Sequence, residues 1–108
     1  MLRNASTKVD GAPFDPPTIE AVWKKGKISP EHNPDVYRQD TCGAWMQRSL
    51  YGKREKWGWE IDHKKPASKG GSDNLDNLQP LYWENNCEKG DDYPEWTCKL
   101  PAGVRRRE

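Results

Sequence analysis

Residues 57–91 read WGWEIDHKKPASKGGSDNLDNLQPLYWENNCEKGD and contain the most regular pattern of the chain. In the first seven residues, large apolar side chains alternate with polar ones, which is the period of a half-buried β-strand. We expect Trp57, Trp59 and Ile61 to face the core, and this strand to end at the polar pair Asp62 and His63.

Turn and helix signals divide the rest of this stretch. Residues 64–76 contain Pro66 and two adjacent glycines, so they predict a long loop. Residues 78–81 resume as a short second strand, held to an edge or to the strand's end by its proline. Residues 82–89 have helical spacing and precede Gly90, a residue that commonly ends helices. The stretch therefore predicts a strand, a loop, a second strand and a short helix.

The segments on either side carry weaker signals. Residues 1–17 read as an irregular arm, and Thr18 can cap a short helix over residues 19–25. Residues 38–46 suggest a turn that opens a strand or hairpin. We accordingly expect an N-terminal arm with a short helix, a central domain and a C-terminal tail, at residues 1–37, 38–92 and 93–108.

Composition limits what this chain can build. Its 108 residues suffice for one domain, of which only 32% are hydrophobic, and the mean hydropathy is −1.20. We expect a thin core, which a bound metal ion or self-association would stabilise. No run approaches the ~20 apolar residues of a membrane span, and the first residues lack the apolar region of a signal peptide. Membrane functions are therefore not expected.

The cysteines do not suggest a framework of their own. Cys42, Cys87 and Cys98 are odd in number and include no C-x-x-C pair. We expect free thiols in a reducing compartment, with neither a disulfide framework nor a four-thiolate zinc site.

The net charge of +1 conceals an uneven distribution. Residues 1–47, 48–70 and 71–108 have net charges of 0, +4 and −3, which sum to +1. A basic run is usually a solvated face, but it also suits a polyanionic partner. The basic side chains of the middle segment are Arg48, Lys53, Arg54, Lys56, Lys64, Lys65 and Lys69.

Four polar residues lie at the joints of the predicted elements: Asp62, His63, Asn77 and Asn86. Phosphodiester hydrolysis needs a water, a base that takes its proton, and a cation that holds the phosphate. A neutral imidazole such as that of His63 can be the base. Asp62 and Asn86 offer oxygen atoms, which suit Mg²⁺ or Mn²⁺.

Other polar residues of this stretch have more than one reading. Asn77 could fix the loop or orient His63, and Lys89, one turn after Asn86, could meet a phosphate or a carboxylate. Glu60 could be an extra metal ligand, although a surface ion pair with a neighbouring lysine is the better reading. His32 lies among turn residues, where we expect it to be exposed and functionally silent.

This constellation resembles the HNH endonuclease family. The family pattern DH-x-x-P-x-S-x-GG…NLQ-x-L…N/H-x-x-K is matched in residue types, with 14 residues from His63 to Asn77 and 9 from Asn77 to Asn86. The match covers about a third of the chain, and the segment from Arg38 to Gly58 is similar to the lead-in of compact bacterial and phage members.

The resemblance implies a small α+β domain with a ββα-metal core, also called a His-Me finger. It implies that His63 is the general base and that Asn77 supports the loop. It also implies that Asp62 and Asn86 hold one divalent ion, with Asn86 in place of the histidine of other branches. Mg²⁺ or Mn²⁺ is then favoured, with Zn²⁺ as an ion that can bind in crystals.

Many relatives also carry two C-x-x-C zinc knuckles, which this sequence lacks. We therefore expect no structural zinc. The tryptophans expected to pack in its place are Trp45, Trp57, Trp59 and Trp83.

The leading hypothesis is a metal-dependent endonuclease that hydrolyses DNA, by nicking or double-strand cleavage. The basic middle segment and Lys89 would contact DNA, and a homodimer is one route to cutting both strands. We expect a cytoplasmic protein, bacterial or phage-encoded. The alternative is a non-catalytic DNA-binding module within a larger packaging or restriction machine. A nuclease or toxin directed at RNA is a third reading.

Overall fold

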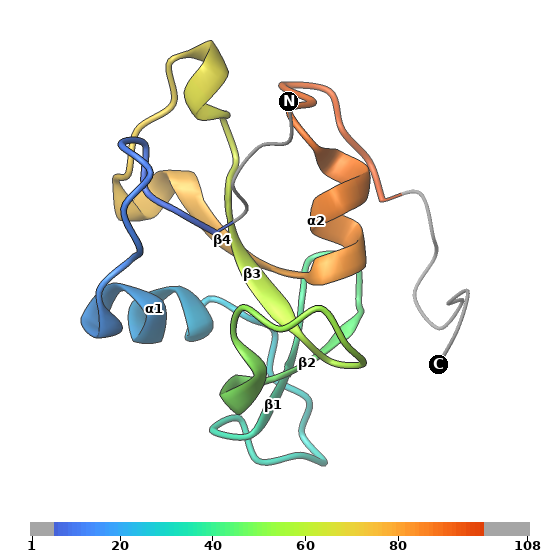
Figure 1. Ribbon diagram of the computed structural model, residues 1–108. Helices are drawn as coiled ribbons and strands as arrows, with labels where there is room; N and C mark the ends of the chain where they lie inside the picture. The colour runs from blue at the N-terminus through green and yellow to red at the C-terminus, as the bar shows by residue number, and fades with distance from the viewer. Residues whose placement is uncertain (1–5, 99–108) are drawn as a thin grey trace.

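The computed structural model describes residues 6–98 and has two helices and two small antiparallel sheets (Figure 1). In chain order the elements are α1 (Pro16–Trp23), β1 (Tyr37–Gln39), β2 (Trp45–Gln47), β3 (Trp59–His63), β4 (Leu78–Tyr82) and α2 (Trp83–Lys89). Strands β1 and β2 form one sheet, and β3 and β4 form the other. The fold is therefore of the expected α+β class.

Strands β3 and β4 pair in antiparallel register from Trp59 opposite Tyr82 to His63 opposite Leu78. The predicted strand, loop, strand and helix are all present in the expected order. The first strand starts at Trp59 rather than Trp57, because Trp57 has a left-handed backbone with φ of 71°. Gly58 follows it, where a Cβ atom would lie 1.8 Å from the Lys53 carbonyl oxygen. Trp57 and Gly58 thus form a turn.

Strand β3 is buried on both faces, although its alternating sequence predicts a half-buried strand. Trp59 and Ile61 lie in the core, as expected, but Glu60 and Asp62 are also buried. The reason is α2, whose residues Asn86 and Lys89 contact these two carboxylates. Both strand faces therefore have a covering layer.

Helix α1 begins at Pro16 rather than at the expected residue 19. Asp15, not Thr18, is the cap, and its Oδ1 accepts a hydrogen bond from the Thr18 backbone N–H. Proline suits the first turn because that turn does not use its missing N–H. Hydrogen bonding with Thr18 lowers the pKa of the Asp15 carboxyl below its ordinary value.

The N-terminal arm has no helix or strand over residues 6–15, as expected of an irregular arm, but in its described part it packs against the rest of the fold. Thr7 and Pro13 form an isolated antiparallel bridge, and the Lys8 N–H donates to the Ala12 carbonyl over 2.8 Å. Phe14 then enters the hydrophobic core together with Trp23 of α1. The arm is thus a folded loop, which we call the arm loop (residues 6–14).

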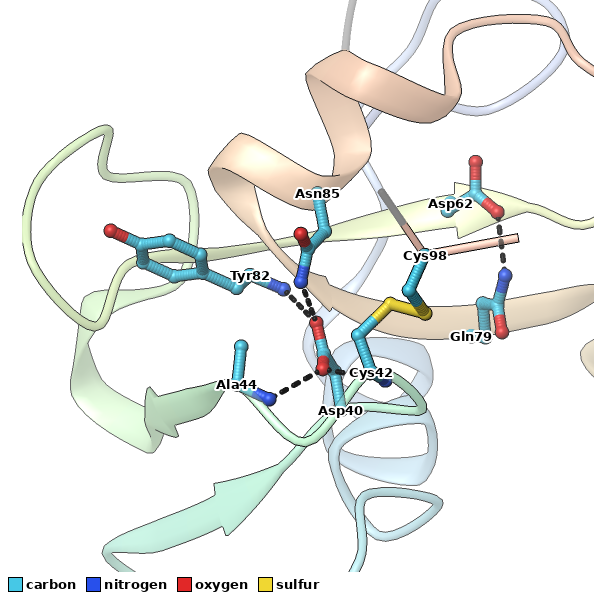
Figure 2. The surroundings of a disulfide bond; sticks show 8 residues. All are labelled: Asp40, Cys42, Ala44, Asp62, Gln79, Tyr82, Asn85 and Cys98. Carbon is cyan, nitrogen blue, oxygen red and sulfur yellow. Dashed lines mark hydrogen bonds between the residues drawn. A yellow bond between two sulfur atoms is a disulfide. The ribbon is translucent and has the colours of Figure 1, made fainter. Parts of the chain in front are cut away.

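Asp40 connects the β1–β2 hairpin to the second sheet (Figure 2). This carboxylate is buried, and its Oδ1 accepts from the backbone N–H groups of Cys42 and Ala44. Its Oδ2 accepts from the Tyr82 N–H and from the Asn85 side chain. One charge therefore closes the hairpin turn and holds the end of β4 and the start of α2.

Cys42 and Cys98 form a disulfide with Cα atoms 5.7 Å apart (Figure 2). The expectation of free thiols is wrong for these two residues, and only Cys87 is a free thiol, which is exposed. The hydrogen bond from the Cys42 N–H to Asp40 fixes Cys42 in the β1–β2 turn. The chain comes back to this turn at Cys98, 56 residues later. Sequence spacing alone does not reveal such a return.

The tryptophans expected to pack together are distributed over the molecule. Trp59 lies 5.2 Å from Trp23 in the core, whereas Trp83 neighbours Tyr82. Trp45 and Trp57 flank Tyr37, and exposed His32 lies 4.5 Å from the Trp45 ring. Across residues 6–98 no helix is long and apolar enough to span a membrane.

Candidate active site

A pocket of about 230 Å³ lies where the end of β3 meets the arm loop and the end of α2. Asp62 and His63 both line this pocket, although neighbouring strand residues normally face opposite sides. The strand ends at His63, which allows both side chains to serve one site. The remaining lining residues are Thr7, Lys8, Val9, Gly11, Pro66, Ala67, Ser68, Gly90 and Asp91.

His63 is held by a carboxylate from the loop that follows it. Its Nε2 lies 2.8 Å from Oδ1 of Asp73, and only 12% of its side chain is exposed. The ring of Phe14 lies 6.0 Å away, centroid to centroid. The imidazole therefore has one polar partner and one aromatic neighbour, both of which restrict its orientation.

Asp62 is buried beneath the pocket, and its partners include Gln79 and Lys89. Its Oδ2 accepts a hydrogen bond of 2.9 Å from Gln79, its cross-strand neighbour (Figure 2). Its Oδ1 lies 3.3 Å from the ammonium group of Lys89, which also donates to the His63 carbonyl. A nearby cation compensates the buried charge of the carboxylate.

Asn77 fixes the loop between the two strands. Its Oδ1 accepts from the Lys65 N–H over 2.9 Å, and its Nδ2 donates to the carbonyls of Lys65 and Ser72. Gly71 is needed beside it, because a Cβ there would lie 1.7 Å from the Lys65 oxygen. Of the two roles considered for Asn77, these contacts are those of loop support.

Asn86 is fully buried and bonded to Glu60. Its Nδ2 donates to Oε1 of Glu60 over 2.7 Å, while Oε2 of Glu60 accepts from Arg54 over 3.1 Å. The expected lysine partner of Glu60 is thus wrong, since the partner is an arginine and the glutamate is buried. Hydrogen bonding to Glu60 also raises the pKa of Arg54.

The oxygen donors of Asp62 and Asn86 are compatible with a hard divalent ion. The bond to Glu60 identifies Nδ2 as one end of the Asn86 amide, so the other end, Oδ1, is its oxygen donor. Asn86 is fully buried and is not among the residues that line the pocket of Asp62 and His63. No group of three or more His, Cys, Asp or Glu that could hold a metal occurs within residues 6–98. Two protein donors fit an ion that keeps several waters, as Mg²⁺ does.

The basic residues predicted to contact DNA lie in three settings. The exposed group in the turn before β3 comprises Lys53, Arg54 and Lys56, and the group in the loop after β3 comprises Lys64, Lys65 and Lys69. Arg48 is exposed but paired with Glu20. Lys89 is buried on the carboxylate of Asp62 rather than on the surface. The exposed basic groups therefore flank the two ends of β3.

Three contributors to this site were not anticipated. They are Asp73 beside His63, Gln79 beside Asp62, and the arm loop at the pocket wall. The pocket-lining residues of the arm loop precede Asp62 by more than 50 residues. The sequence of this loop has no periodic apolar pattern that would predict its Thr7–Pro13 bridge. The position of Gln79 opposite Asp62 follows only once the strand register is known.

Comparison with known proteins assigns the segment that holds these residues. Residues 52–92 match the model of the HNH endonuclease family. Searches of curated proteins and of solved structures found no match. The matched segment includes β3, β4 and α2, and with them Asp62, His63, Asn77 and Asn86. Over residues 52–92, about two fifths of the chain, this protein is therefore similar to the HNH endonuclease family.

Proposed function

We propose that this protein is a metal-dependent endonuclease that hydrolyses phosphodiester bonds of DNA, with a ββα-metal core formed by β3, β4 and α2. The observation that carries the proposal is that Asp62 and His63 line the same pocket. Both residues lie in residues 52–92, which match the HNH family model and are called the family segment below. A base and an oxygen ligand side by side are the minimum that one-metal phosphodiester hydrolysis requires.

His63 acts as the general base in this proposal. Its Nε2 is engaged by Asp73, so the other ring nitrogen, Nδ1, takes the proton of the attacking water. The phosphate would bind in the pocket that Asp62 and His63 line. Asn77 keeps the loop that follows His63 in place through its three hydrogen bonds.

Asp62 and Asn86 would hold one Mg²⁺ or Mn²⁺ ion. When bound, such an ion supplies a positive charge for the phosphate and the leaving oxygen. Gln79 and Lys89 orient the carboxylate of Asp62, the first through a hydrogen bond and the second through an ion pair. Glu60 orients Asn86 in the same way.

The lysines of the loop after β3 bind the phosphates nearest the cut. Lys64 follows His63 directly in sequence, and Lys65 and Lys69 flank the pocket-lining residues 66–68. The group of Lys53, Arg54 and Lys56 would meet phosphates farther along the duplex. Asp62 and His63 make one site, which cuts one strand at a time.

The test is cleavage of a supercoiled plasmid with Mg²⁺ or Mn²⁺, with and without EDTA. Wild-type protein should produce relaxed circles only with free metal. His63→Ala should abolish cleavage, whereas His32→Ala is the matched control, because His32 is exposed and lies outside the pocket. Circular dichroism should show the same fold for all three proteins.

Titration calorimetry with Mn²⁺ tests the metal ligands. Asp62→Asn should weaken Mn²⁺ binding along with cleavage. Metal-independent cleavage, or an active His63→Ala variant, would contradict the mechanism. A gel shift of DNA without relaxed circles would favour a non-catalytic DNA-binding module, and preferential cleavage of RNA would redirect the substrate assignment.

A further inference from the structure

The carboxylate of Asp73 links His63 to the arm loop, which lies outside the family segment. Oδ1 of Asp73 is 2.8 Å from Nε2 of His63 and 3.0 Å from the backbone nitrogen of Val9. We infer that Asp73 is a positioning residue for the base, and that the arm loop holds Asp73 in place and closes the active-site pocket. This inference rests on the proposed function and assigns two further parts to the same site.

The carboxylate determines which tautomer His63 adopts. A carboxylate accepts hydrogen bonds and does not donate them, so Nε2 of His63 carries the hydrogen in this pair. Nδ1 is then the basic nitrogen. The negative charge also stabilises the imidazolium that forms when Nδ1 takes a proton, as the aspartate does in a Ser-His-Asp triad.

Asp73 needs an external support, because it lies in a loop and is one-third exposed. The Val9 N–H provides it, with distances of 3.0 and 3.3 Å to the two carboxylate oxygens. Without this donor, a carboxylate at a loop position would have more rotational freedom. The base is therefore oriented by a chain of contacts from Val9 through Asp73 to His63.

The arm loop is itself fastened to the strand that carries the base. Ser6 Oγ accepts from the Ile61 N–H over 2.9 Å and donates to the Tyr51 hydroxyl over 2.6 Å. The Thr7–Pro13 bridge then directs Lys8 and Val9 to the pocket wall. The loop is thus anchored on β3 on one side and on Asp73 on the other.

Four variants separate this role from a purely structural one. Asp73→Ala removes the carboxylate, and Asp76→Ala is its control, because Asp76 is exposed in the same loop and does not line the pocket. Val9→Pro removes the donor N–H without a change of charge. Val9→Ala is the comparison variant, since it keeps this N–H and shortens only a side chain at the pocket wall.

The expected result is a loss in kcat with little change in KM. Asp73→Ala should lower kcat by roughly 100-fold, in the range of general-base effects, and Val9→Pro by about tenfold. KM should stay within about twofold, because neither residue binds DNA in this mechanism. Asp76→Ala should behave as wild type, Val9→Ala should lose less kcat than Val9→Pro because it keeps the N–H, and melting curves should show that all four variants fold.

A spectroscopic measurement supplies a readout that loop damage alone would not move. Long-range ¹⁵N–¹H correlation spectra at fixed pH report which nitrogen of His63 carries the hydrogen. Wild type should show the Nε2–H tautomer, and Asp73→Ala should show a mixture of tautomers. An unchanged tautomer together with an unchanged kcat in Asp73→Ala would overturn the inference.

The two proposals can fail separately. If wild-type protein does not cleave DNA, the proposed function is wrong, yet the tautomer of His63 still decides whether Asp73 orients the ring. If wild type cleaves and Asp73→Ala cleaves equally well with an unchanged tautomer, the nuclease proposal stands and the positioning role is refuted.

Discussion

The ammonium group of Lys89 lies 3.3 Å from Oδ1 of Asp62, and the two side chains are only 3% and 1% exposed. Removal of one partner from a buried ion pair leaves an uncompensated charge, which typically costs about 3–5 kcal/mol. Lys89→Met should therefore lower the free energy of unfolding by about this amount in urea denaturation. The lysine is thus a part of the interior as well as a neighbour of the site.

The matched control for Lys89→Met is the double variant Asp62→Asn/Lys89→Met. Because both charges are removed together, it should recover much of the lost stability. If Lys89→Met alone unfolds at the wild-type urea concentration, the pair does not stabilise the fold.

Asp40 should be among the most sensitive positions of the fold. Asp40→Ala leaves four donors without their acceptor, three of them backbone N–H groups. Hydrogen bonds to a charged group contribute about 1.5–3 kcal/mol each, so a loss of at least about 3 kcal/mol is expected. Thermal denaturation measures it, with exposed Asp35→Ala as control. Equal melting temperatures for the two variants would refute the role of Asp40.

The disulfide predicts a specific thiol count. The protein has three cysteines, of which Cys42 and Cys98 are paired and Cys87 is exposed. A thiol reagent should therefore titrate one group in the native protein and three after reduction and unfolding. Cys42→Ser should lower the stability by about 2–4 kcal/mol, because the crosslink restricts the unfolded chain. Cys87→Ser should leave the stability unchanged and abolish the native thiol signal.

The cap of α1 predicts an acid-sensitive contribution. Hydrogen bonding with Thr18 lowers the pKa of Asp15 in the folded protein below its ordinary value of 3.8. Its contribution is therefore complete above pH 3.8 and is lost as the pH falls through the lower, folded-state pKa. Asp15→Asn still caps the helix but does not titrate. The melting temperature of wild type relative to Asp15→Asn should thus fall between pH 5 and pH 2, and parallel curves would contradict this assignment.

Free and paired basic residues should contribute differently to DNA binding. Lys64 is exposed next to His63, whereas Arg48 is already engaged by Glu20. Lys64→Ala should therefore reduce the salt dependence of DNA binding by about one phosphate contact, a change of about 0.9 in slope. Arg48→Ala should change it less. Fluorescence anisotropy across a salt series distinguishes the two, and equal slopes would refute the placement of Lys64 on the DNA.

The central elements could be predicted because their signals are local. The alternation that leads to His63, the glycine-rich loop and Gly90 after α2 each lie within a few residues of the feature that they specify. The same locality explains the correct class of the fold and the choice of Asp62 and His63 as neighbours at a strand end. These are properties that short-range pattern can encode.

The parts that sequence did not reveal depend on pairs distant in the chain. Cys42 joins Cys98 across 56 residues, and Val9 reaches Asp73 across 64. The burial of Glu60 has the same origin, because α2 covers the polar face of β3 only in the folded chain. Alternation of apolar and polar residues indicates that one face of a strand is buried, but it does not indicate whether a second layer covers the polar face.

The hydrogen bonds of Asp40 show that the segment matched by the HNH family model depends on residues outside that segment. Residues 52–92, transplanted into another scaffold, would carry Asp62 and His63 but would leave the Tyr82 N–H and the Asn85 amide without their carboxylate. Trp59 would also lose Trp23, its core neighbour. A functional graft of this motif must therefore import, or imitate, an acidic turn and an aromatic helix from outside its recognisable borders.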